Sequence, residues 1–451
     1  MKKLTAILAS VAFIGSAYAA DSEVSQNAEF RLRYKYDQNA DRTDSGSKDA
    51  WYSRVKWGST FRAGEKFTGH LAVLHNSTFG VSGVAGDMHT ALPSAELNTE
   101  NALLVQSAYV NWMISNDLML KVGRMPIVIG DERVMGENDY LANPYAFEGF
   151  GLGYESEFAH VGFYGLKLAD FSWNSMNDNL VRPNDGGATD TDNAASSSAK
   201  DPERNLYIVN VDFKSLPEFL NMANLHIIAD NQSEVNNLGT ADSNYSKREV
   251  TRYGVAIGGE AAGVDYRVTY EAVGGTTEDN TTETDVESNM MDIELGYSFD
   301  WMASRVHVLH HTDSGTGTGS TKNETYDGFF YEKHYNAGLM DLFGWGNLTY
   351  STLGYTMNPS DKSEYGLGYT MFTRTEKASS VSNLMGSSYT LVNDEDDLGS
   401  EIDLYAKYKY DGGLDILTRV GMFTPGAAFT DLTPKQDENH MQFFVQARWK
   451  F

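Results

Sequence analysis

The chain ends in Met441-Gln-Phe-Phe-Val-Gln-Ala-Arg-Trp-Lys-Phe451, where every second residue, counted from Met441, is apolar. The residues between them are mostly polar or charged. Successive side chains of a β-strand point to opposite faces of its sheet, so this period of two predicts a strand with one apolar and one polar face.

The same alternation recurs along the chain, for example at 29–36, 264–272, 291–299 and 402–409. We predict eighteen strands, centred near residues 31, 57, 71, 109, 121, 151, 162, 209, 227, 255, 268, 294, 307, 351, 369, 405, 418 and 446. Their connections alternate in length. Short turns are predicted at 63–66, 115–117, 260–263, 300–303, 358–363 and 411–413. Long loops rich in Gly, Ser, Thr, Asn and Asp are predicted at 37–49, 76–102, 167–204, 231–248, 273–287, 313–345, 374–399 and 424–438.

The alternation of short and long connections, rather than the average composition, indicates that the protein lies in a membrane. The 451 residues include 26 tyrosines and have a mean hydropathy of −0.41, and no segment holds 18 consecutive apolar residues, so no transmembrane helix is predicted. A closed antiparallel sheet crosses a membrane with all its backbone amides paired and only alternate side chains facing lipid. The predicted fold class is all-β, a transmembrane antiparallel β-barrel of about 18 strands, with short periplasmic turns, long extracellular loops and aromatic girdles.

The two ends of the chain predict export and assembly. Lys2 and Lys3 precede an apolar and small-residue run from 4 to 17 and then Ala-Tyr-Ala at 17–19, the order of a secretory signal peptide. We predict that 1–19 is a cleaved signal peptide, that 20–451 is one barrel domain, and that the protein lies in the outer membrane of a Gram-negative bacterium. Phe451, in register with the apolar face, is predicted to be the signal for the barrel insertion machinery.

Charge and cysteine content exclude several functions. The formal charge of −27 argues against nucleic acid as a partner, and the absence of Cys excludes disulfides, thiol catalysis and cysteine-bound metals. Acidic runs at 278–287 and 394–397 are interpreted as solvated loop charge, with divalent cation binding at the lipopolysaccharide surface as the alternative. No cofactor and no metal is predicted, and the partners expected are outer-membrane lipid, lipopolysaccharide and a hydrophilic solute.

The inward positions of the predicted strands carry charges that segregate by sign. Strands at the two ends of the chain, which meet when the sheet closes, form a basic wall of Arg31, Arg33, Lys35, Arg54, Lys56, Arg62, Lys407, Lys409, Arg419, Arg448 and Lys450. The opposite, mainly acidic wall consists of Asp230, Arg252, Asp265, Arg267, Glu271, Asp292 and Glu294. Such walls produce a transverse field that acts on charged solutes. The alternative is that these charges pair between neighbouring strands and stiffen the barrel.

One stretch resembles a known family. Lys121-Val-Gly-Arg-Met-Pro126, Gly130-Asp-Glu-Arg-Val-Met-Gly136 and Phe147-Glu-Gly-Phe150 resemble the alginate-export family of outer-membrane porins over about residues 121–153. The resemblance implies an eighteen-stranded, monomeric barrel with a basic lumen that conducts an anionic polysaccharide. It implies an ordered loop near the pore mouth, with charge-assisted pairing of Arg124 and Arg133 to Asp131 or Glu148. The positions that carry over are Gly123, Arg124, Gly130, Asp131, Arg133 and Gly149, and Glu148 belongs to the same motif as a replacement. This chain departs from the family at three places. Met125 stands where the family usually has Gln, Glu148 stands where it usually has Asp, and no Trp lies between Gly136 and Phe147.

We therefore predict a porin-like channel for passive passage of hydrophilic, charged solutes, such as anionic saccharides or small organic molecules. The alternative is a non-conducting barrel that acts as an adhesin, a receptor or a structural protein. No catalytic residue is predicted, because alternation places His310 opposite His307 and His311 and no spacing indicates a triad. The apolar segment 329–345 is expected either to fold inward as a constriction or to cap the rim.

Overall fold

The computed structural model describes residues 22–44, 46–79, 103–169, 204–232, 246–279, 282–334, 337–384, 386, 388–392, 394–432 and 435–451. The predicted signal peptide at 1–19 lies outside these residues. The predicted loops 76–102, 167–204 and 231–248 lie largely outside them.

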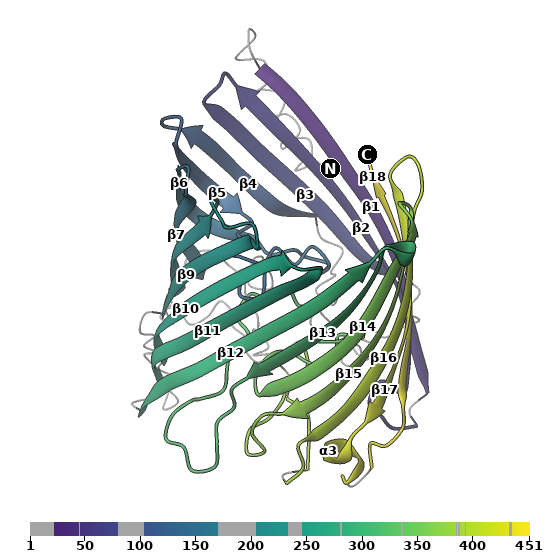
Figure 1. The fold of residues 1–451 in the computed structure, drawn as a ribbon. Helices are drawn as coiled ribbons and strands as arrows, with labels where there is room; N and C mark the ends of the chain where they lie inside the picture. Colours follow the sequence, from purple (N-terminus) through teal and green to yellow (C-terminus); the bar gives the residue numbers. More distant parts are fainter. Residues whose placement is uncertain are drawn as a thin grey trace, which may run out of the picture.

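Eighteen antiparallel strands in the described residues confirm the predicted fold class and strand positions. Each strand pairs with its neighbours in sequence, and β1 pairs with β18 from Glu29–Lys450 to Gln38–Met441, which closes the sheet (Figure 1). The strands are β1 (Ser22–Gln38), β2 (Ser47–Ala63), β3 (Phe67–Phe79), β4 (Leu103–Met113), β5 (Leu118–Met125), β6 (Phe147–Glu155), β7 (Ala159–Ala169), β8 (Arg204–Phe213), β9 (Leu220–Gln232), β10 (Ser246–Ala261), β11 (Val264–Asp279), β12 (Thr282–Phe299), β13 (Ser304–Asp313), β14 (Leu348–Ser360), β15 (Ser363–Arg374), β16 (Asp397–Lys409), β17 (Leu414–Pro425) and β18 (His440–Lys450).

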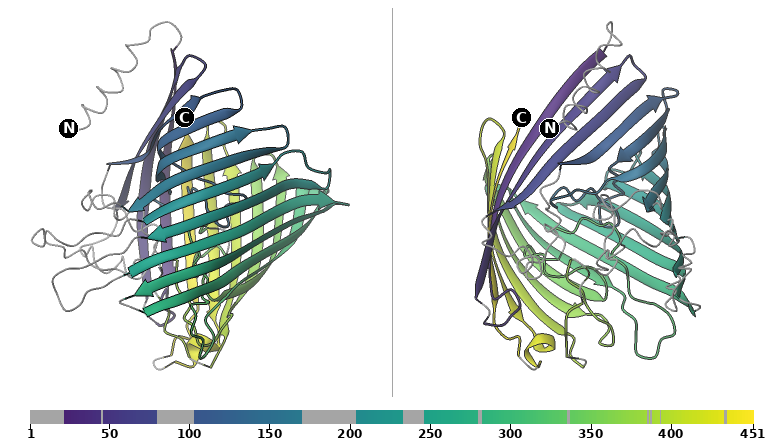
Figure 2. Two further views of the ribbon diagram at one scale, coloured as in Figure 1. Left: turned by 90° about the vertical axis from the view of Figure 1, so that its left-hand side faces the viewer. Right: turned by 180° about the vertical axis from the view of Figure 1, so that it is seen from behind.

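Short and long connections lie at opposite ends of the barrel, as predicted. The short turns and the C-terminus lie at the upper end in Figure 1, and the four-residue helix α3 (Ala427–Thr430) of the β17–β18 loop lies at the lower end. Figure 2 shows the strands strongly tilted around a closed wall. By the usual asymmetry of such barrels, the short-turn end is periplasmic.

The predicted loop 273–287 is wrong. β11 and β12 continue as a paired ribbon as far as Asp279 and Thr282, with Glu278 opposite Glu283 and Thr277 opposite Thr284. The threonines in this stretch favour extended backbone, and this preference outweighs the polarity that we interpreted as loop. The acidic residues of the stretch therefore belong to strands.

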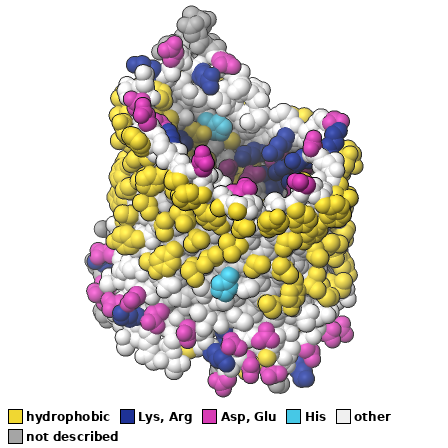
Figure 3. Space-filling model, viewed as in Figure 1, with side chains coloured by type: hydrophobic (Ala, Val, Ile, Leu, Met, Phe, Trp, Pro, Cys, Tyr) yellow, Lys and Arg dark blue, Asp and Glu magenta, His cyan; other side chains and the backbone are white. Residues whose placement is uncertain are grey.

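A band of apolar side chains crosses the face of the barrel that Figure 3 shows. It includes the exposed Val122, Phe150, Leu152, Leu353 and Leu404, whose lumen-facing neighbours in sequence are polar or glycine. Exposed aromatic residues flank the short turns: Phe67, Trp112, Tyr154, Phe158, Tyr297, Trp301, Tyr410 and Trp449. This pattern matches the predicted aromatic girdle at the periplasmic interface. Within the described residues, no helix combines the length and apolarity that a membrane span requires.

The hydrophobic core lies inside the barrel, toward its long-loop end. The β5–β6 loop (126–146) contributes Ile127, Ile129 and Met135, and the β13–β14 loop (314–347) contributes Phe330 and Phe343 among others. These residues pack on inward side chains of the wall such as Phe147, Phe372 and Phe423. The apolar segment 329–345 therefore folds into the lumen, which was one of its two predicted placements.

Deleting Phe451 is expected to reduce insertion of the barrel at least severalfold. Its ring is 74% exposed on the outer face, and its backbone is bonded to Ala28 by two hydrogen bonds of 2.8 and 3.2 Å, so the aromatic group is displayed at the β1–β18 seam. The measurement is the fraction of full-length chain recovered in outer membranes. Phe67→Ala, which removes another exposed aromatic residue of the same girdle, serves as the control. Normal insertion without Phe451 would refute its assembly role.

Candidate functional site: the barrel lumen

The predicted basic wall lies on the lumen side of five adjacent strands, β16, β17, β18, β1 and β2. The register places Arg31 directly between Arg54 and Arg448. Arg31, Arg33, Lys35, Arg54 and Arg419 are buried, whereas Lys56, Lys407 and Arg448 are half-buried. The remaining members, Arg62, Lys409 and Lys450, are exposed toward the periplasmic end. In the side view of Figure 3, the upper end of the barrel shows a hollow in which Lys and Arg side chains lie beside Asp and Glu side chains.

The β5–β6 loop is bound to the basic wall mainly through its backbone. Arg31 donates hydrogen bonds of 2.7 Å to the carbonyl oxygens of Asp139 and Leu141. Arg54 donates to the same two carbonyls at 3.0 and 3.1 Å, and also to the carboxylates of Glu29 and Asp139. Since carbonyl oxygens carry no net charge, these bonds satisfy the donors of Arg31 without neutralising its charge, whereas Arg54 is also paired with two carboxylates.

Tyr140 joins both inward loops to the wall. Its ring lies between the Arg33 guanidinium, 4.0 Å from the ring centroid, and the His334 imidazole, which stacks at 3.5 Å. Its hydroxyl accepts a 2.6 Å hydrogen bond from Arg419. Tyr140 is half-buried and its three partners are buried, so the cation–π and charge-assisted contacts are stronger than at an exposed surface. These contacts hold the β5–β6 and β13–β14 loops together against the wall, and we call them the Tyr140 lock.

The β13–β14 loop is also anchored to β16 and β17. Glu401 accepts hydrogen bonds from the backbone N–H groups of Leu339 and Met340 at 2.6 and 3.0 Å, and Arg419 donates to the Leu339 carbonyl at 2.9 Å. Glu401 was not among the predicted site residues, although its alternation with Ile402 places it on the lumen side. The two loops therefore span the lumen from the basic wall to the opposite wall.

The predicted opposite wall faces the lumen, but each of its carboxylates is bound to arginine. Asp230 pairs with Arg204 and Arg248, and Glu271 pairs with Arg252 at 3.0 Å. Asp265 and Glu294 both bind Arg305, and Glu294 also binds Arg267. Arg204, Arg248 and Arg305 were not among the predicted lumen residues. On this wall the charges pair between strands, so it is not a surface of free carboxylates.

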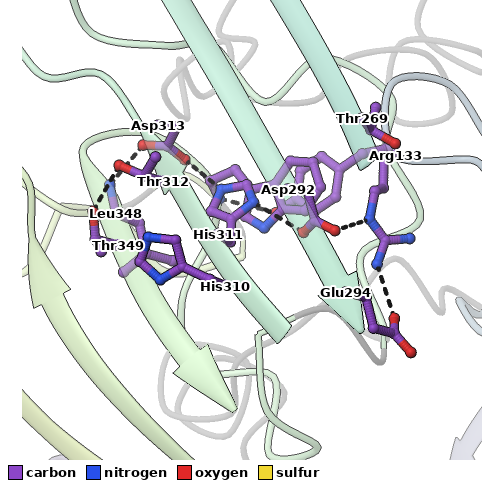
Figure 4. A network of polar contacts seen from close by, with 12 residues as sticks. Arg133, Thr269, Asp292, Glu294, His310, His311, Thr312, Asp313, Leu348 and Thr349 are labelled. Atoms are coloured by element: carbon purple, nitrogen blue, oxygen red, sulfur yellow. Dashed lines mark hydrogen bonds and ion pairs between the residues drawn. The ribbon is translucent and has the colours of Figure 1, made fainter. Parts of the chain in front are cut away.

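Asp292 completes this pairing through the β5–β6 loop (Figure 4). Arg133 donates a 2.6 Å hydrogen bond from Nε to Asp292, whose other oxygen lies 3.3 Å from Nδ1 of His311. Asp313 follows on the far side of His311 at 3.2 Å. His310 lies on the opposite face, as predicted, beside the hydroxyl of Ser351 at 2.9 Å.

The family-like motif divides between the two faces of the wall. Arg124 pairs with Glu148 at 3.4 Å on the outer face, where Glu148 is exposed, whereas Arg133 and Asp131 pair inside the lumen at 3.3 Å. Gly123 has φ +127°, and a Cβ there would lie 2.3 Å from the carbonyl oxygen of Ala108. A Cβ at Gly149 would likewise lie too close to the carbonyl oxygen of Gly165. Gly130 has φ +54° at the start of the turn in the β5–β6 loop. The glycines thus permit the backbone conformations at the strand ends from which the inward loop begins and to which it returns.

Among the described residues, no group of three or more His, Asp or Glu side chains could hold a metal ion. The acidic residues 394–396 lie in the β15–β16 loop (375–396), where Lys377 contacts Asp394 and Asp396.

Acidification is expected to strengthen docking of the β13–β14 loop. Burial raises the pKa of Glu332 in this loop to about 8, and the nearby Glu132 and Asp341 charges act in the same direction. An undocked, hydrated Glu has a pKa near 4.3, so the docked loop binds the extra proton between about pH 4.5 and 8. Docking therefore weakens as pH rises through this window. Burial raises the pKa of Asp341 to about 7, with the same sign.

Single-channel conductance is the measurement for this pH effect. It should increase from pH 5.5 to 8, and Glu332→Gln should reduce the increase because an amide does not titrate. Glu65→Gln, in the exposed turn between β2 and β3, is the control. An unchanged pH profile in Glu332→Gln would show that this carboxyl does not govern docking.

Comparisons with known proteins agree with this architecture. A family model described as "Alginate export" matches residues 22–443. Among curated proteins, none matches the sequence. Similar solved structures include the outer membrane protein OpdK of Pseudomonas aeruginosa, with 10% identity over 95% of this chain and 98% of that chain and a TM-score of 0.55. OccD3 (OpdP) of the same organism has 13% identity over 95% and 91% and a TM-score of 0.53. OccAB4 of Acinetobacter baumannii has 11% identity over 95% and 98% and a TM-score of 0.55. At these identities the likeness concerns the fold.

Proposed function

The chain belongs to the alginate-export family and is an outer-membrane porin, and from this premise we propose that its lumen conducts hydrophilic anionic solutes. The solutes would be anionic saccharides or small organic acids that pass down their concentration gradient. Passage needs no cofactor, because the selective element is the electrostatic potential of the wall.

The observation that carries this proposal is the unequal neutralisation of the two walls. On the basic wall, Arg54 pairs with Glu29 and Asp139, but Arg31 donates to neutral carbonyl oxygens. Lys409 and Lys450 form no ion pair with any residue in the described ranges. On the opposite wall every predicted carboxylate has an arginine partner. The lumen therefore retains a positive potential on one side, which concentrates anions in a narrow aqueous passage with low-dielectric walls.

A second candidate function is a non-conducting barrel with an adhesive or receptor role. It is favoured by the packing of two loops across the long-loop half of the lumen, where Met135, Phe147 and Phe330 form a buried apolar contact. An eighteen-stranded barrel is wide enough for an aqueous channel only where loops leave space.

Proteoliposome swelling tests the proposal. Purified full-length protein should admit sodium glucuronate faster than glucosamine hydrochloride, with glucose as the neutral reference of similar size. Swelling no faster than in protein-free liposomes would support the non-conducting barrel. Faster entry of glucosamine would contradict the anionic preference.

A further inference from the structure

A cavity of about 170 Å³ lies between the β13–β14 and β15–β16 loops, at the long-loop end of the barrel. It is separate from the basic wall, because none of its lining residues belongs to β16, β17, β18, β1 or β2. Its lining includes Asp327, Tyr331, Lys333, Trp345 and Ser382.

Lys333 provides a buried and only partly satisfied cation in this cavity. Lys333 is only 9% exposed. Its ammonium group donates one hydrogen bond, of 2.9 Å, to the carbonyl oxygen of Leu384. An ammonium group has three donors, and the two others have no acceptor among the residues that the structure describes. Leaving charge-bearing donors unpaired in a buried place is costly, so this position favours a ligand that supplies acceptors.

The remaining surface of the cavity suits a small hydroxylated acid. Tyr331 and Trp345 stack on each other at 4.2 Å and give one flat apolar side, and the hydroxyl of Ser382 makes no hydrogen bond to another described residue. The one carboxylate that lines the cavity, Asp327, is held by Arg248 at 3.1 Å and Arg252 at 3.4 Å. Its negative charge is therefore compensated from the barrel wall, and the cavity remains open to an anion.

We propose that this cavity is a binding site for the carboxylate of a single sugar acid or a similarly small hydroxy acid, with Lys333 as its anion-binding residue. Ligand pockets usually measure roughly 300–1,000 Å³, so this smaller volume fits one sugar-sized unit. The site deepens the proposed function and rests on it, as an entry position where an anionic solute is captured on the extracellular side before it reaches the basic wall.

The probe for this site is sodium glucuronate, added to either side of single channels of the full-length protein in a planar bilayer. Glucuronate is expected to interrupt the current from the long-loop side at lower concentration than glucose does. Lys333→Met should raise the half-blocking concentration of glucuronate at least tenfold, measured relative to the current of the same variant in plain KCl. Lys322→Met, at an exposed lysine of the same loop, is the matched control, and glucuronate should block it at the same concentration as the native channel.

A titration of the native protein tests the same site without a variant. Burial lowers the pKa of Lys333 to about 8, against an opposing effect of Asp327, and the Arg248 and Arg252 cations that face Asp327 do not titrate in this range. Block by glucuronate, which stays ionised, should therefore weaken at least fivefold from pH 7 to 9.5, whereas any block by glucose should not change.

The outcomes separate the site from the channel function. Equal block of the native and Lys333→Met channels, or block that does not change with pH, would overturn the Lys333 site even if the channel prefers anions. Cation-selective channels that still lose glucuronate block in Lys333→Met would overturn the proposed function and keep the site.

Discussion

Replacing residues 328–345 with a short Gly-Ser linker is expected to raise the single-channel conductance roughly threefold or more, because this segment occupies the long-loop half of the lumen. It contributes Phe330, Tyr331, Phe343 and Trp345 to the internal core. Its removal would return that volume to water, whereas the closed strand pairing of the wall does not depend on it.

Point variants at the Tyr140 lock test the same mechanism without a deletion. Tyr140→Ala removes the contacts with Arg33, His334 and Arg419 together, and it should increase the frequency of high-conductance openings. Tyr140→Phe keeps both stacking contacts and loses only the hydroxyl, so its effect should be intermediate. Unchanged conductance in the linker variant and in Tyr140→Ala would show that the loops do not constrict the passage.

Reversing the charge of three lysines of the basic wall is expected to change ion selectivity. Lys409 and Lys450 form no ion pair with a described residue, and Lys407 lies 3.8 Å from Glu364. The triple variant Lys407→Glu, Lys409→Glu, Lys450→Glu alters residues that are half-buried or exposed on the lumen side, and it avoids Arg31 and Arg54, which hold the β5–β6 loop. An ideally selective channel develops about 59 mV in a tenfold gradient of a monovalent salt, and we expect a shift on the order of 20 mV toward cation preference.

The control for this variant is Lys66→Glu, an exposed lysine in the turn between β2 and β3 at the same end of the barrel. It changes the net charge near the mouth without altering the lumen wall. A similar shift in Lys66→Glu, or none in the triple variant, would mean that surface charge rather than the basic wall sets selectivity.

The alternation of the sequence predicted the wall of this barrel because a strand's period of two is a local property. The alternation of side chains alone placed Arg31, Arg54 and Asp292 on the lumen side, in agreement with the register of the strands. Arg305 lies on the same face as His307 and His311, and strict use of the period would have found it. Arg204 and Arg248 begin or nearly begin strands beside long loops, where the sequence marks boundaries poorly.

The constriction could not be predicted in the same way, because its contacts join residues far apart in the chain. Asn138 donates to the Phe330 carbonyl across 192 residues, and Tyr140 meets His334 in the same region. The only local signal was the unusual apolar content of 329–345. The ion pair of Asp292 on the opposite wall likewise depends on Arg133, a loop residue whose direction no periodic pattern defines.

The most direct test of an anion-conducting lumen is the reversal potential of single channels of the full-length protein in a tenfold KCl gradient. The geometry predicts discrete current steps whose reversal potential has the sign of chloride preference and shifts toward zero in the triple lysine variant. The absence of steps, or a reversal potential with the sign of potassium preference in the native protein, would contradict it.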